Sequence, residues 1–282
     1  QRIEITLCKI GEKIMKVQLL ISAMHKNPKN LIKKMEVFSD AILINQCDEN
    51  GYEEFTVKDS LGEERTIRAY SFLERGVGLS RNNALLRADQ EISLFSDEDI
   101  RYDMDYEKKI VQEFDKHKEA DVLLFNVRVC EERQTYFNTD YHRVRWYNCG
   151  RYPAYAIAIR TEKMHQCNLT FSLLFGGGAK YSNGEDSLFL RDCLKAGLKM
   201  YATEVVIGEE EKGESTWFFG YNQKFFYDRG VLYHYLYGKM ARIWGLRFLF
   251  KNKNTMCKEI PFKMAYGYLK DGISFAKHKK EK

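Results

Sequence analysis

The chain has 282 residues and a formal net charge of +5, with 44% hydrophobic and 30% charged residues. This composition is typical of a folded globular protein and excludes a fibrous or disordered one. No run approaches the about 20 apolar residues that cross a bilayer, and the first residues lack the order of a signal peptide, so we expect a cytoplasmic protein. Seven cysteines without a C-x-x-C pair argue against a disulfide framework and a structural zinc site.

The first half of the chain alternates between predicted strands and helices. The apolar run at 16–22 is typical of a buried strand, and Asn27-Pro28 combines a capping residue with proline at a first helical position. A second strand is expected at 40–46, which completes a strand–helix–strand unit. Further strands are expected at 66–72, 91–96 and 121–129, and further helices within 76–88 and at 106–117. This alternation predicts an α/β fold with a mainly parallel sheet.

The second half of the chain is less regular. We expect a strand at 155–159, a glycine-rich loop at 175–183, a helix at 185–196, a strand at 200–207, and mostly helix at 223–252 and 262–273. No clean linker interrupts the chain, so we expect one compact domain at 16–222, with a helical C-terminal extension at 223–282. Residues 1–15 precede the first strand as an N-terminal extension of undefined role.

Asp97-Glu98-Asp99 follows an apolar strand directly. Ligands bind beyond the carboxyl ends of strands in open α/β sheets. Neighbouring carboxylates repel one another unless a cation lies between them, and Asp103 and Asp105 add to the repulsion. Oxygen ligands suit Mg²⁺ or Mn²⁺. The cluster therefore predicts a divalent metal site, and the alternative interpretation is an acidic turn that caps a helix beginning at Tyr106.

Gly184-Glu185-Asp186 opens the predicted helix that follows the glycine-rich loop. Acidic residues in a first helical turn are ordinary capping residues. A flexible loop that delivers a carboxylate to a cleft is also a common way to build a site. Both interpretations stay open for this motif.

Arg81-Asn82 lies at a loop–helix junction before the acidic strand. Arg81 could bind a phosphate or a base edge, and the alternative is a solvated helical arginine. The glycines at 75–78 do not match the dinucleotide fingerprint, and 176–180 does not match a phosphate-binding P-loop. Both of those nucleotide-binding classes are therefore disfavoured.

The ordered set of motifs resembles family 2 glycosyltransferases. The run RNNALLRADQEISLFSDED, from Arg81 to Asp99, is similar to the Arg-Asn helix and Asp-x-Asp strand of that family, and Glu185-Asp186 is similar to its later Glu-Asp motif. The resemblance covers roughly residues 16–220. It implies a GT-A fold: a Rossmann-like, mainly parallel central sheet flanked by helices, with a nucleotide-binding part at about 16–105 and an acceptor-binding part at about 106–222.

The resemblance also implies the reaction, which is transfer of a sugar from a nucleotide-sugar donor, often UDP-linked, to a glycan or lipid-linked acceptor. It implies that Asp97 and Asp99 hold Mn²⁺ or Mg²⁺ and that Asp186 is the general base. A single base suggests direct displacement with inversion. By position, the donor-binding residues would be Ser22, Ala23, Asn45, Asp48, Arg81, Asp97 and Glu98, with Glu185 on the acceptor side.

The chain departs from the family pattern at the ends of its first two strands. Ser22-Ala23-Met24-His25 stands where the family usually has Pro-Thr-Tyr-Asn, and Asn45-Gln46-Cys47-Asp48 stands where it usually has Asp-Asp-Gly-Ser. Some relatives carry a late histidine near the metal. The stretch 209–212 has none, and His234 lies further along the chain. The base-binding residues are therefore the least well matched part of the site.

Several aromatic residues flank the predicted base in the sequence. Trp146 and Trp217 are the best candidates for stacking on the acceptor sugar, and the alternative is that such residues belong to the core.

The charge of the chain is unevenly distributed. Residues 239–282 contain twelve basic and three acidic residues, a net charge of +9, which leaves about −4 for residues 1–238. The segment 231–253 mixes bulky apolar with basic residues, a pattern that can lie on an anionic membrane surface. The alternative is a packed helix with a solvated basic face. No nucleic-acid recognition motif occurs, so we expect no nucleic-acid partner.

Two other classes of protein remain as alternatives. A nucleotidyltransferase would need a glycine-rich basic loop after the first strand, and residues 24–28 contain no glycine. A non-catalytic sugar- or membrane-binding protein with a degenerate site would not need Asp97, Asp99 and Asp186 together.

Overall fold

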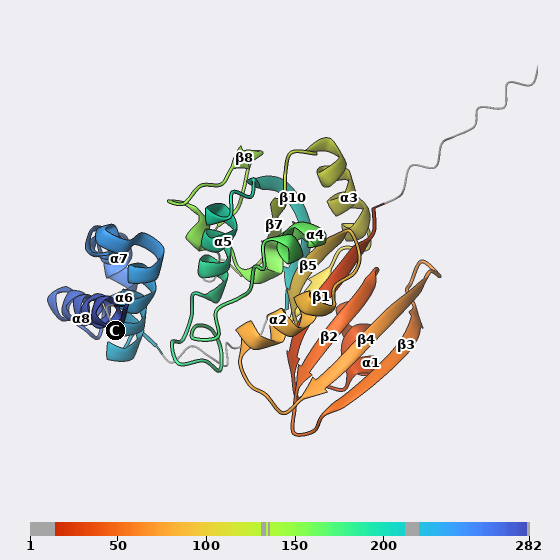
Figure 1. The fold of residues 1–282 in the computed structure, drawn as a ribbon, viewed down its shortest axis with the longest axis horizontal. Helices are drawn as coiled ribbons and strands as arrows, with labels where there is room; N and C mark the ends of the chain where they lie inside the picture. Colours follow the sequence, from red (N-terminus) through yellow and green to blue (C-terminus); the bar gives the residue numbers. More distant parts are fainter. Residues whose placement is uncertain (1–14, 131–133, 135, 212–219, 281–282) are drawn as a thin grey trace, which may run out of the picture.

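The chain is described by a computed structural model over residues 15–130, 134, 136–211 and 220–280. Its centre is a ten-stranded sheet with the order β3-β4-β2-β1-β5-β9-β7-β10-β6, and β8 pairs with β10 (Figure 1). The strands are β1 (Val17–Met24), β2 (Asp40–Gln46), β3 (Gly51–Lys58), β4 (Glu64–Phe72), β5 (Ile92–Asp97), β6 (Ile100–Tyr102), β7 (Val122–Arg128), β8 (His142–Arg143), β9 (Ile157–Arg160) and β10 (Met200–Glu210).

Most of the central strands run in the same direction. β4, β2, β1 and β5 pair in parallel, and so do β7 and β10. β9 lies antiparallel between β5 and β7, while β3 and β6 are antiparallel edge strands. The sheet is therefore mixed but mostly parallel, as the alternation of strands and helices predicted.

Helices cover both faces of the sheet. One face carries α1 (Pro28–Met35) and α3 (Tyr106–Lys116), and the other carries α2 (Val77–Arg87), α4 (Thr161–Gln166) and α5 (Glu185–Lys195). Successive side chains of a strand point to opposite faces, so Leu19 and Ile21 join the first core while Leu20 joins the second. This double burial explains why β1 reads as a continuous apolar run.

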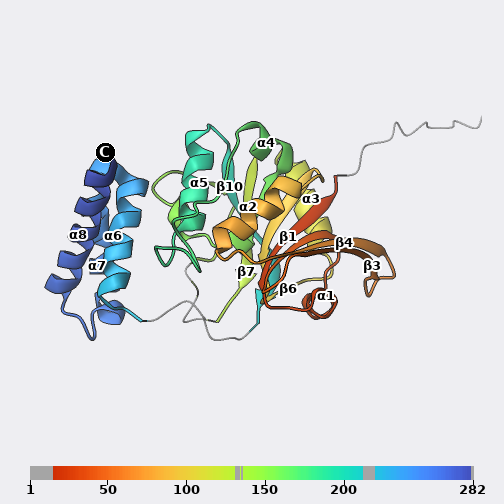
Figure 2. The ribbon, with the colours of Figure 1, turned by 60° about the horizontal axis from the view of Figure 1, so that its bottom comes forward.

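Three C-terminal helices form a third core beside α5. They are α6 (Gln223–Tyr237), α7 (Ala241–Met256) and α8 (Phe262–Lys280), and they lie side by side (Figure 2). A methyl group at Gly230 would lie 2.0 Å from the carbonyl oxygen of Leu269, and one at Gly272 would lie 2.1 Å from that of Tyr227. These two glycines therefore allow α6 and α8 to approach closely.

The structure confirms most predicted elements, divides one predicted helix and adds short or polar elements that were not predicted, among them β6 and β8. The side chain of Asn27 accepts a hydrogen bond from the N–H of Asn30 at 3.1 Å, which confirms the predicted cap of α1. The helix expected over 223–252 ends at Tyr237, and α7 begins after Gly238, whose φ is +54°. β3 and α4 were not predicted, because β3 is an edge strand of polar residues and α4 is short.

The predicted N-terminal extension cannot be compared with the structure, because residues 1–14 lie outside the described residues. Met15 packs against the first core. No helix among the described residues combines the length and the apolar composition that crossing a bilayer requires.

Candidate active site

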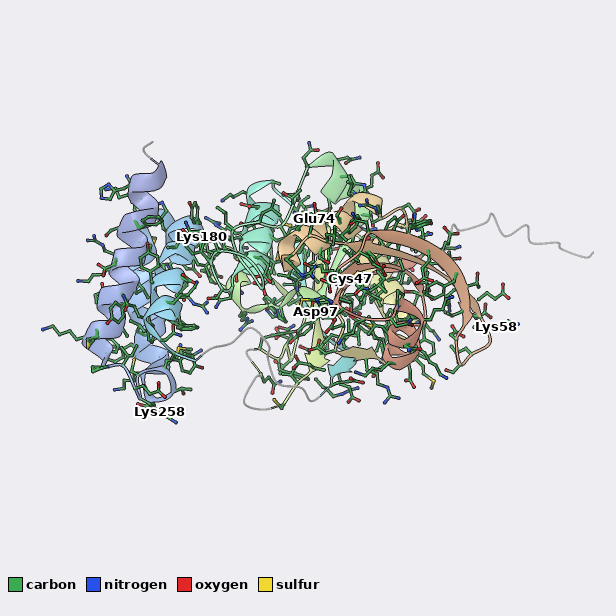
Figure 3. All side chains as sticks on the ribbon, turned by 90° about the horizontal axis from the view of Figure 1, so that it is seen from below. Cys47, Lys58, Glu74, Asp97, Lys180 and Lys258 are labelled. Carbon is green, nitrogen blue, oxygen red and sulfur yellow. The ribbon has the colours of Figure 1, made fainter. Side chains whose placement is uncertain are left out.

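The carboxyl ends of β1, β2 and β5 meet at one edge of the sheet, because the three strands are parallel neighbours. Ser22 lies in register with Asp97 on β5, and Ala23 lies in register with Asn45 on β2. Figure 3 shows Asp97 and Cys47 in this part of the molecule. The structure therefore brings together residues that the resemblance assigned to the donor site and that the sequence places far apart.

Arg81 connects this edge to α5. Its Nη2 atom donates to both oxygens of Asp97 at 2.8 and 3.2 Å, and its Nη1 atom donates to Oε1 of Glu185 at 2.8 Å. Burial lowers the pKa of Arg81, but Asp97 and Glu185 more than offset this effect. Arg81 is thus a buried cation held between two carboxylates, rather than the solvated arginine considered from the sequence. A direct contact of Arg81 with a nucleotide stays a prediction.

Asp186 lies in the first turn of α5, next to Glu185. Its Oδ1 atom accepts a hydrogen bond from the N–H of Ser187 at 2.7 Å. Desolvation and the charge of Glu185 raise the pKa of Asp186 to about 7, against the opposing effect of Arg81. A carboxylate with a pKa near neutrality is well suited to accept a proton from a hydroxyl group.

Glu185 has a different immediate partner from the one expected. It was predicted to contact an acceptor, but it is only 9% exposed and one of its oxygens accepts from Arg81. This pair fixes the start of α5 and therefore the position of Asp186. A contact of Glu185 with an acceptor stays a prediction.

The glycine-rich loop before α5 packs tightly against both sides of the site. Gly176 has φ +105°, and a methyl group there would lie 2.8 Å from the carboxyl carbon of Glu185. Gly184 has φ +110°, and a methyl group there would lie 2.4 Å from Leu232 of α6. The N–H of Val77 donates to the carbonyl of Gly177 at 2.9 Å, which ties the loop to the start of α2.

Two further side chains hold the same region, and sequence reasoning assigned neither of these roles. The amide of Asn82 accepts from the N–H of Phe171 at 2.6 Å and donates to its carbonyl at 2.9 Å. Asp228 of α6 accepts from both the N–H and the hydroxyl of Ser182 at 3.0 Å. The loop expected to be flexible is therefore anchored to α2 and to α6.

The acidic cluster after β5 is largely neutralised by the chain itself. Glu98 pairs with Lys26 at 3.2 Å and accepts from the N–H of Met24 at 2.8 Å. Asp103 and Asp105 each lie 2.8 Å from the Nζ atom of Lys109. Lysine and arginine therefore already supply compensating charge to Asp97, Glu98, Asp103 and Asp105, and a divalent cation at Asp97 and Asp99 stays a prediction.

The structure also bears on how a metal could bind. Within the described residues, no group of three or more His, Cys, Asp or Glu side chains is arranged to hold a metal ion. Both oxygens of Asp97 accept from Arg81, and Asp99 lies two residues further along the same turn. Mg²⁺ is usually held through one or two carboxylates together with substrate phosphates. Binding of such a cation by Asp99 together with a phosphorylated ligand stays a prediction.

The residues expected to bind the nucleobase have partners of their own. The amide of Asn45 accepts from the N–H of Lys26 at 3.0 Å and donates to its carbonyl at 2.8 Å. Asp48 is exposed and accepts from Arg75 at 2.9 Å, and it lies 3.7 Å from His25. His25 and Arg75 were not singled out from the sequence, because only the fold brings them to Asp48.

The candidate acceptor residues are divided between described and undescribed segments. Trp146 is 38% exposed, and its ring centroid lies 5.9 Å from that of Trp244 in α7. It precedes a 3-10 turn, η1 (Cys149–Arg151), where a methyl group at Gly150 would lie 3.6 Å from the hydroxyl of Ser187 in α5. Trp217 lies outside the described residues. Trp146 is therefore on the side of the site that faces the C-terminal helices α6, α7 and α8, which we call the helical unit.

No protein-family model matches this chain, and no curated protein matches it. Solved structures do match. S. aureus TarS residues 1–349 in complex with UDP-GlcNAc are 16% identical, with 87% of this chain and 74% of that chain covered and a TM-score of 0.57. The mannosyltransferase PcManGT from Pyrobaculum calidifontis, in complex with GDP-Man and Mn²⁺, is 10% identical, with 94% and 88% covered and a TM-score of 0.51.

These similarities establish the fold. TarS 1–349 without a named ligand gives 15% identity, 94% of this chain and 82% of that chain covered, and a TM-score of 0.58. The GT-A fold expected from the sequence, with a mostly parallel sheet and a C-terminal helical part, is therefore confirmed. Membership of family 2 stays a prediction.

Proposed function

We propose that this protein is a glycosyltransferase that moves a sugar from a nucleotide-sugar donor, UDP-linked, to a hydroxyl of a glycan or lipid-linked acceptor. One observation carries the proposal: Arg81 joins Asp97 at the end of β5 to Glu185 at the start of α5. This buried bridge holds Asp186 beside the edge where the donor residues meet. The solved structures of similar fold bind UDP-GlcNAc and GDP-Man, which supports a nucleotide-sugar donor.

Asp186 is the proposed general base. It accepts the proton of the acceptor hydroxyl while that oxygen bonds to the anomeric carbon of the donor sugar. The bond between the anomeric carbon and the phosphate oxygen breaks, and the nucleoside diphosphate leaves with the electron pair. A single displacement of this kind inverts the anomeric configuration. The raised pKa of Asp186 makes its carboxylate a stronger base than an ordinary aspartate.

The donor is proposed to lie along the carboxyl edge of the sheet. Ser22, Ala23, Asn45 and Glu98 line the ends of β1, β2 and β5. Asp48 is the proposed base-binding residue, since its exposed carboxylate is held by Arg75. The position of Asp48 after β2 supports this assignment.

Asp99 is the proposed principal ligand of Mn²⁺ or Mg²⁺, with Asp97 as the second candidate. When bound, such a cation would supply positive charge to the leaving diphosphate. Arg81 already neutralises Asp97. We therefore expect loss of Asp99 to affect metal-dependent donor binding more selectively than loss of Asp97, which would also disturb the buried bridge.

The proposed acceptor side includes a membrane-facing helix. On α7, Ile243, Leu246 and Phe250 are 65%, 41% and 65% exposed. On a helix of 3.6 residues per turn, these three residues form one stripe, and the exposed Arg242 and Arg247 flank it. Such an arrangement suits a helix lying in the plane of an anionic membrane. We propose peripheral attachment at the inner face of the cell membrane, where a lipid-linked acceptor would be presented.

The test of the proposed function measures melting temperature against nucleotides and nucleotide sugars, each with and without Mn²⁺. A ligand that binds only the folded state raises the melting temperature. We expect one nucleotide sugar to raise it in a metal-dependent way, and the effect to be lost in Asp99→Asn. Asp105→Asn is the matched control, because Asp105 lies nearby but pairs with Lys109.

Three results would contradict the proposal. No shift with any donor would favour a non-catalytic binding protein. An equal loss in Asp105→Asn would remove the special role of Asp99. Release of pyrophosphate from a nucleoside triphosphate and a sugar phosphate would identify a nucleotidyltransferase instead.

A further inference from the structure

Two arginines, Arg191 and Arg229, lie at the junction of α5 with the C-terminal helices. Arg191 of α5 and Arg229 of α6 make no ion pair or hydrogen bond within the described part of the chain, and the Nε atoms of both are buried without a partner. Both side chains are partly exposed, but an N–H donor that is buried without a partner is costly. The Nε atom of Arg81 is also buried without a partner in the described chain, but the other two nitrogens of Arg81 bond to two carboxylates.

Each of the two arginines lies against an aromatic ring. The guanidinium of Arg191 lies 5.9 Å from the ring centroid of Trp146, and Trp146 contacts Trp244, which stacks on Tyr237 at 4.9 Å. The guanidinium of Arg229 lies 5.0 Å from the ring of Phe248. These contacts offset part of the cost of burial, but they leave the N–H donors unused. The indole Nε1 of Trp244 is a third buried donor without a partner in the described chain.

Tyr237 connects the two arginines. The ring of Tyr237 stacks on Trp244 on the side of Arg191, and its centroid lies 5.2 Å from that of Tyr233. Tyr233 contacts Phe248, over which Arg229 lies. Burial raises the pKa of Tyr237, and the charges of both arginines oppose that effect. The junction is thus a single positive, aromatic-walled region.

This region adjoins the proposed base. A methyl group at Gly150 would lie 3.6 Å from the hydroxyl of Ser187 and 3.7 Å from that of Tyr237. Ser187 follows Asp186 in the chain, so Tyr237 faces the first turn of α5. Arg229 also lowers the pKa of Asp186. The two arginines therefore lie on the helical-unit side of Asp186, whereas Arg81 connects its neighbour Glu185 to the donor edge.

We propose that Arg191 and Arg229 bind a phosphate group of the acceptor, next to the sugar that receives the transferred residue. The inference rests on the proposed function and names its acceptor class: a glycan that carries a phosphate. Guanidinium groups match phosphate oxygens through paired, charge-assisted hydrogen bonds. Trp146, which is partly exposed, provides a face on which the adjoining sugar can stack.

The donor diphosphate does not account for these arginines equally well. Its expected place is the edge formed by Asp97 and Asp99, and Arg81 is the cation that lies there. Arg191 lies more than one helical turn beyond Asp186 along α5. A second phosphate group, on the acceptor, gives both arginines a partner without displacing the donor.

The experiment measures binding of two phosphate probes, sn-glycerol 3-phosphate and geranyl diphosphate, by thermal shift and calorimetry. The proteins are the wild type, Arg191→Gln, Arg229→Gln, the double variant, and Arg101→Gln as a control. Arg101 carries the same charge but lies on β6, where it pairs with Glu36 on the surface. Glycerol is the matched probe without phosphate, and UDP with Mn²⁺ reports on the donor site.

We expect each single variant to weaken phosphate binding by roughly tenfold, since a hydrogen bond to a charged group is removed. The double variant should lose binding, while Arg101→Gln and the affinity for UDP should stay unchanged. Stronger binding of geranyl diphosphate would indicate a lipid-linked diphosphate acceptor. Stronger binding of glycerol 3-phosphate would indicate a phosphate-containing polymer.

Three outcomes would overturn the inference: binding of neither probe by the wild type, binding that survives in the double variant, or a parallel loss of UDP affinity. If a glutamine variant fails to fold, Arg191→Lys or Arg229→Lys takes its place in the binding measurements, because lysine keeps the charge but not the guanidinium group. Phosphate binding through the arginines without binding of any nucleotide would refute the proposed function alone. Nucleotide binding without phosphate binding would refute this inference alone.

Discussion

The edge of the sheet and the junction of α5 with the helical unit differ in whether their charged side chains have partners of opposite charge. At the sheet edge, Asp97, Glu98 and Glu185 each have a cationic partner from the same chain. At the junction, Arg191 and Arg229 have no such partner among the described residues. The comparison teaches that the charges of the proposed donor side are paired before any ligand binds. The phosphate site that we propose at the junction would instead receive its counter-charge from the acceptor.

The largest expected effect tests the preorganised region through its base. Asp186→Asn should lower the transfer rate by about 10²- to 10⁴-fold, because general base catalysis typically contributes that much. The measurement is kcat for sugar transfer, or for hydrolysis of the donor when no acceptor is supplied. Asp192→Asn is the matched control, since Asp192 lies on the same helix and pairs with Lys195 on the surface. Equal losses in both variants would argue against a specific role for Asp186.

The raised pKa of Asp186 adds a pH dependence of known sign. The base acts when it is ionised, so kcat/KM should fall as the pH drops below about 7. In the unfolded chain the carboxyl ionises near its ordinary value of 3.8, while in the folded protein it keeps its proton up to about 7. Stability should therefore decrease between these values as the pH rises. Asp186→Asn should abolish this decrease in a urea titration, and an unchanged pH profile would contradict the assignment.

The next effect tests how much the pairing of Arg81 with Asp97 and Glu185 stabilises the fold. Arg81→Met should destabilise the protein by about 3–5 kcal/mol, because it leaves the buried Glu185 and the partly buried Asp97 without a counter-charge. Equilibrium unfolding in urea measures the change. Arg101→Met is the control and should have a small effect, because it removes only a surface ion pair with Glu36. A loss below about 1 kcal/mol for Arg81→Met would show that the bridge is not a buried pair in solution.

A smaller effect tests the close contact between Gly184, at the start of α5, and Leu232 of α6. Gly184→Ala should cost about 2–3 kcal/mol, because φ at this position is +110° and the new methyl group would lie 2.4 Å from Leu232. Gly197→Ala separates the two causes, since Gly197 has φ +84° but nothing lies within 4 Å of its added methyl group. Thermal unfolding of both variants gives the comparison. Equal losses would show that the contact with α6 contributes nothing.

The smallest expected effect tests the outer face of the helical unit. Ile243→Ser should weaken binding to vesicles that contain phosphatidylglycerol by about tenfold, because the variant has less apolar side-chain area to bury in the membrane. Sedimentation with anionic and with neutral vesicles measures this. Leu86→Ser, which changes a 75% exposed leucine on α2, should leave binding unchanged. Equal binding to neutral vesicles would remove the role of Arg242 and Arg247.

Local patterns alone determined much of the fold. Asn27-Pro28 marks the start of α1, and the continuous apolar runs of β1 and β2 mark strands buried on both faces. Cap chemistry and hydrophobic periodicity act over a few residues, so they can be read without knowing the rest of the chain. The resemblance of the ordered motifs to family 2 glycosyltransferases also implied the GT-A fold.

Only the tertiary structure decided which charges meet. Arg81 and Glu185 are separated by 104 residues, and their pairing depends on the packing of α2 against the sheet and of the glycine-rich loop against α5. The same packing leaves Arg191 and Arg229 without a partner among the described residues. Residue types and spacing do not encode which distant side chains come within hydrogen-bond distance. The sequence therefore predicted the carboxylates of the site, whereas the folded chain decided which were neutralised and where a counter-charge is still missing.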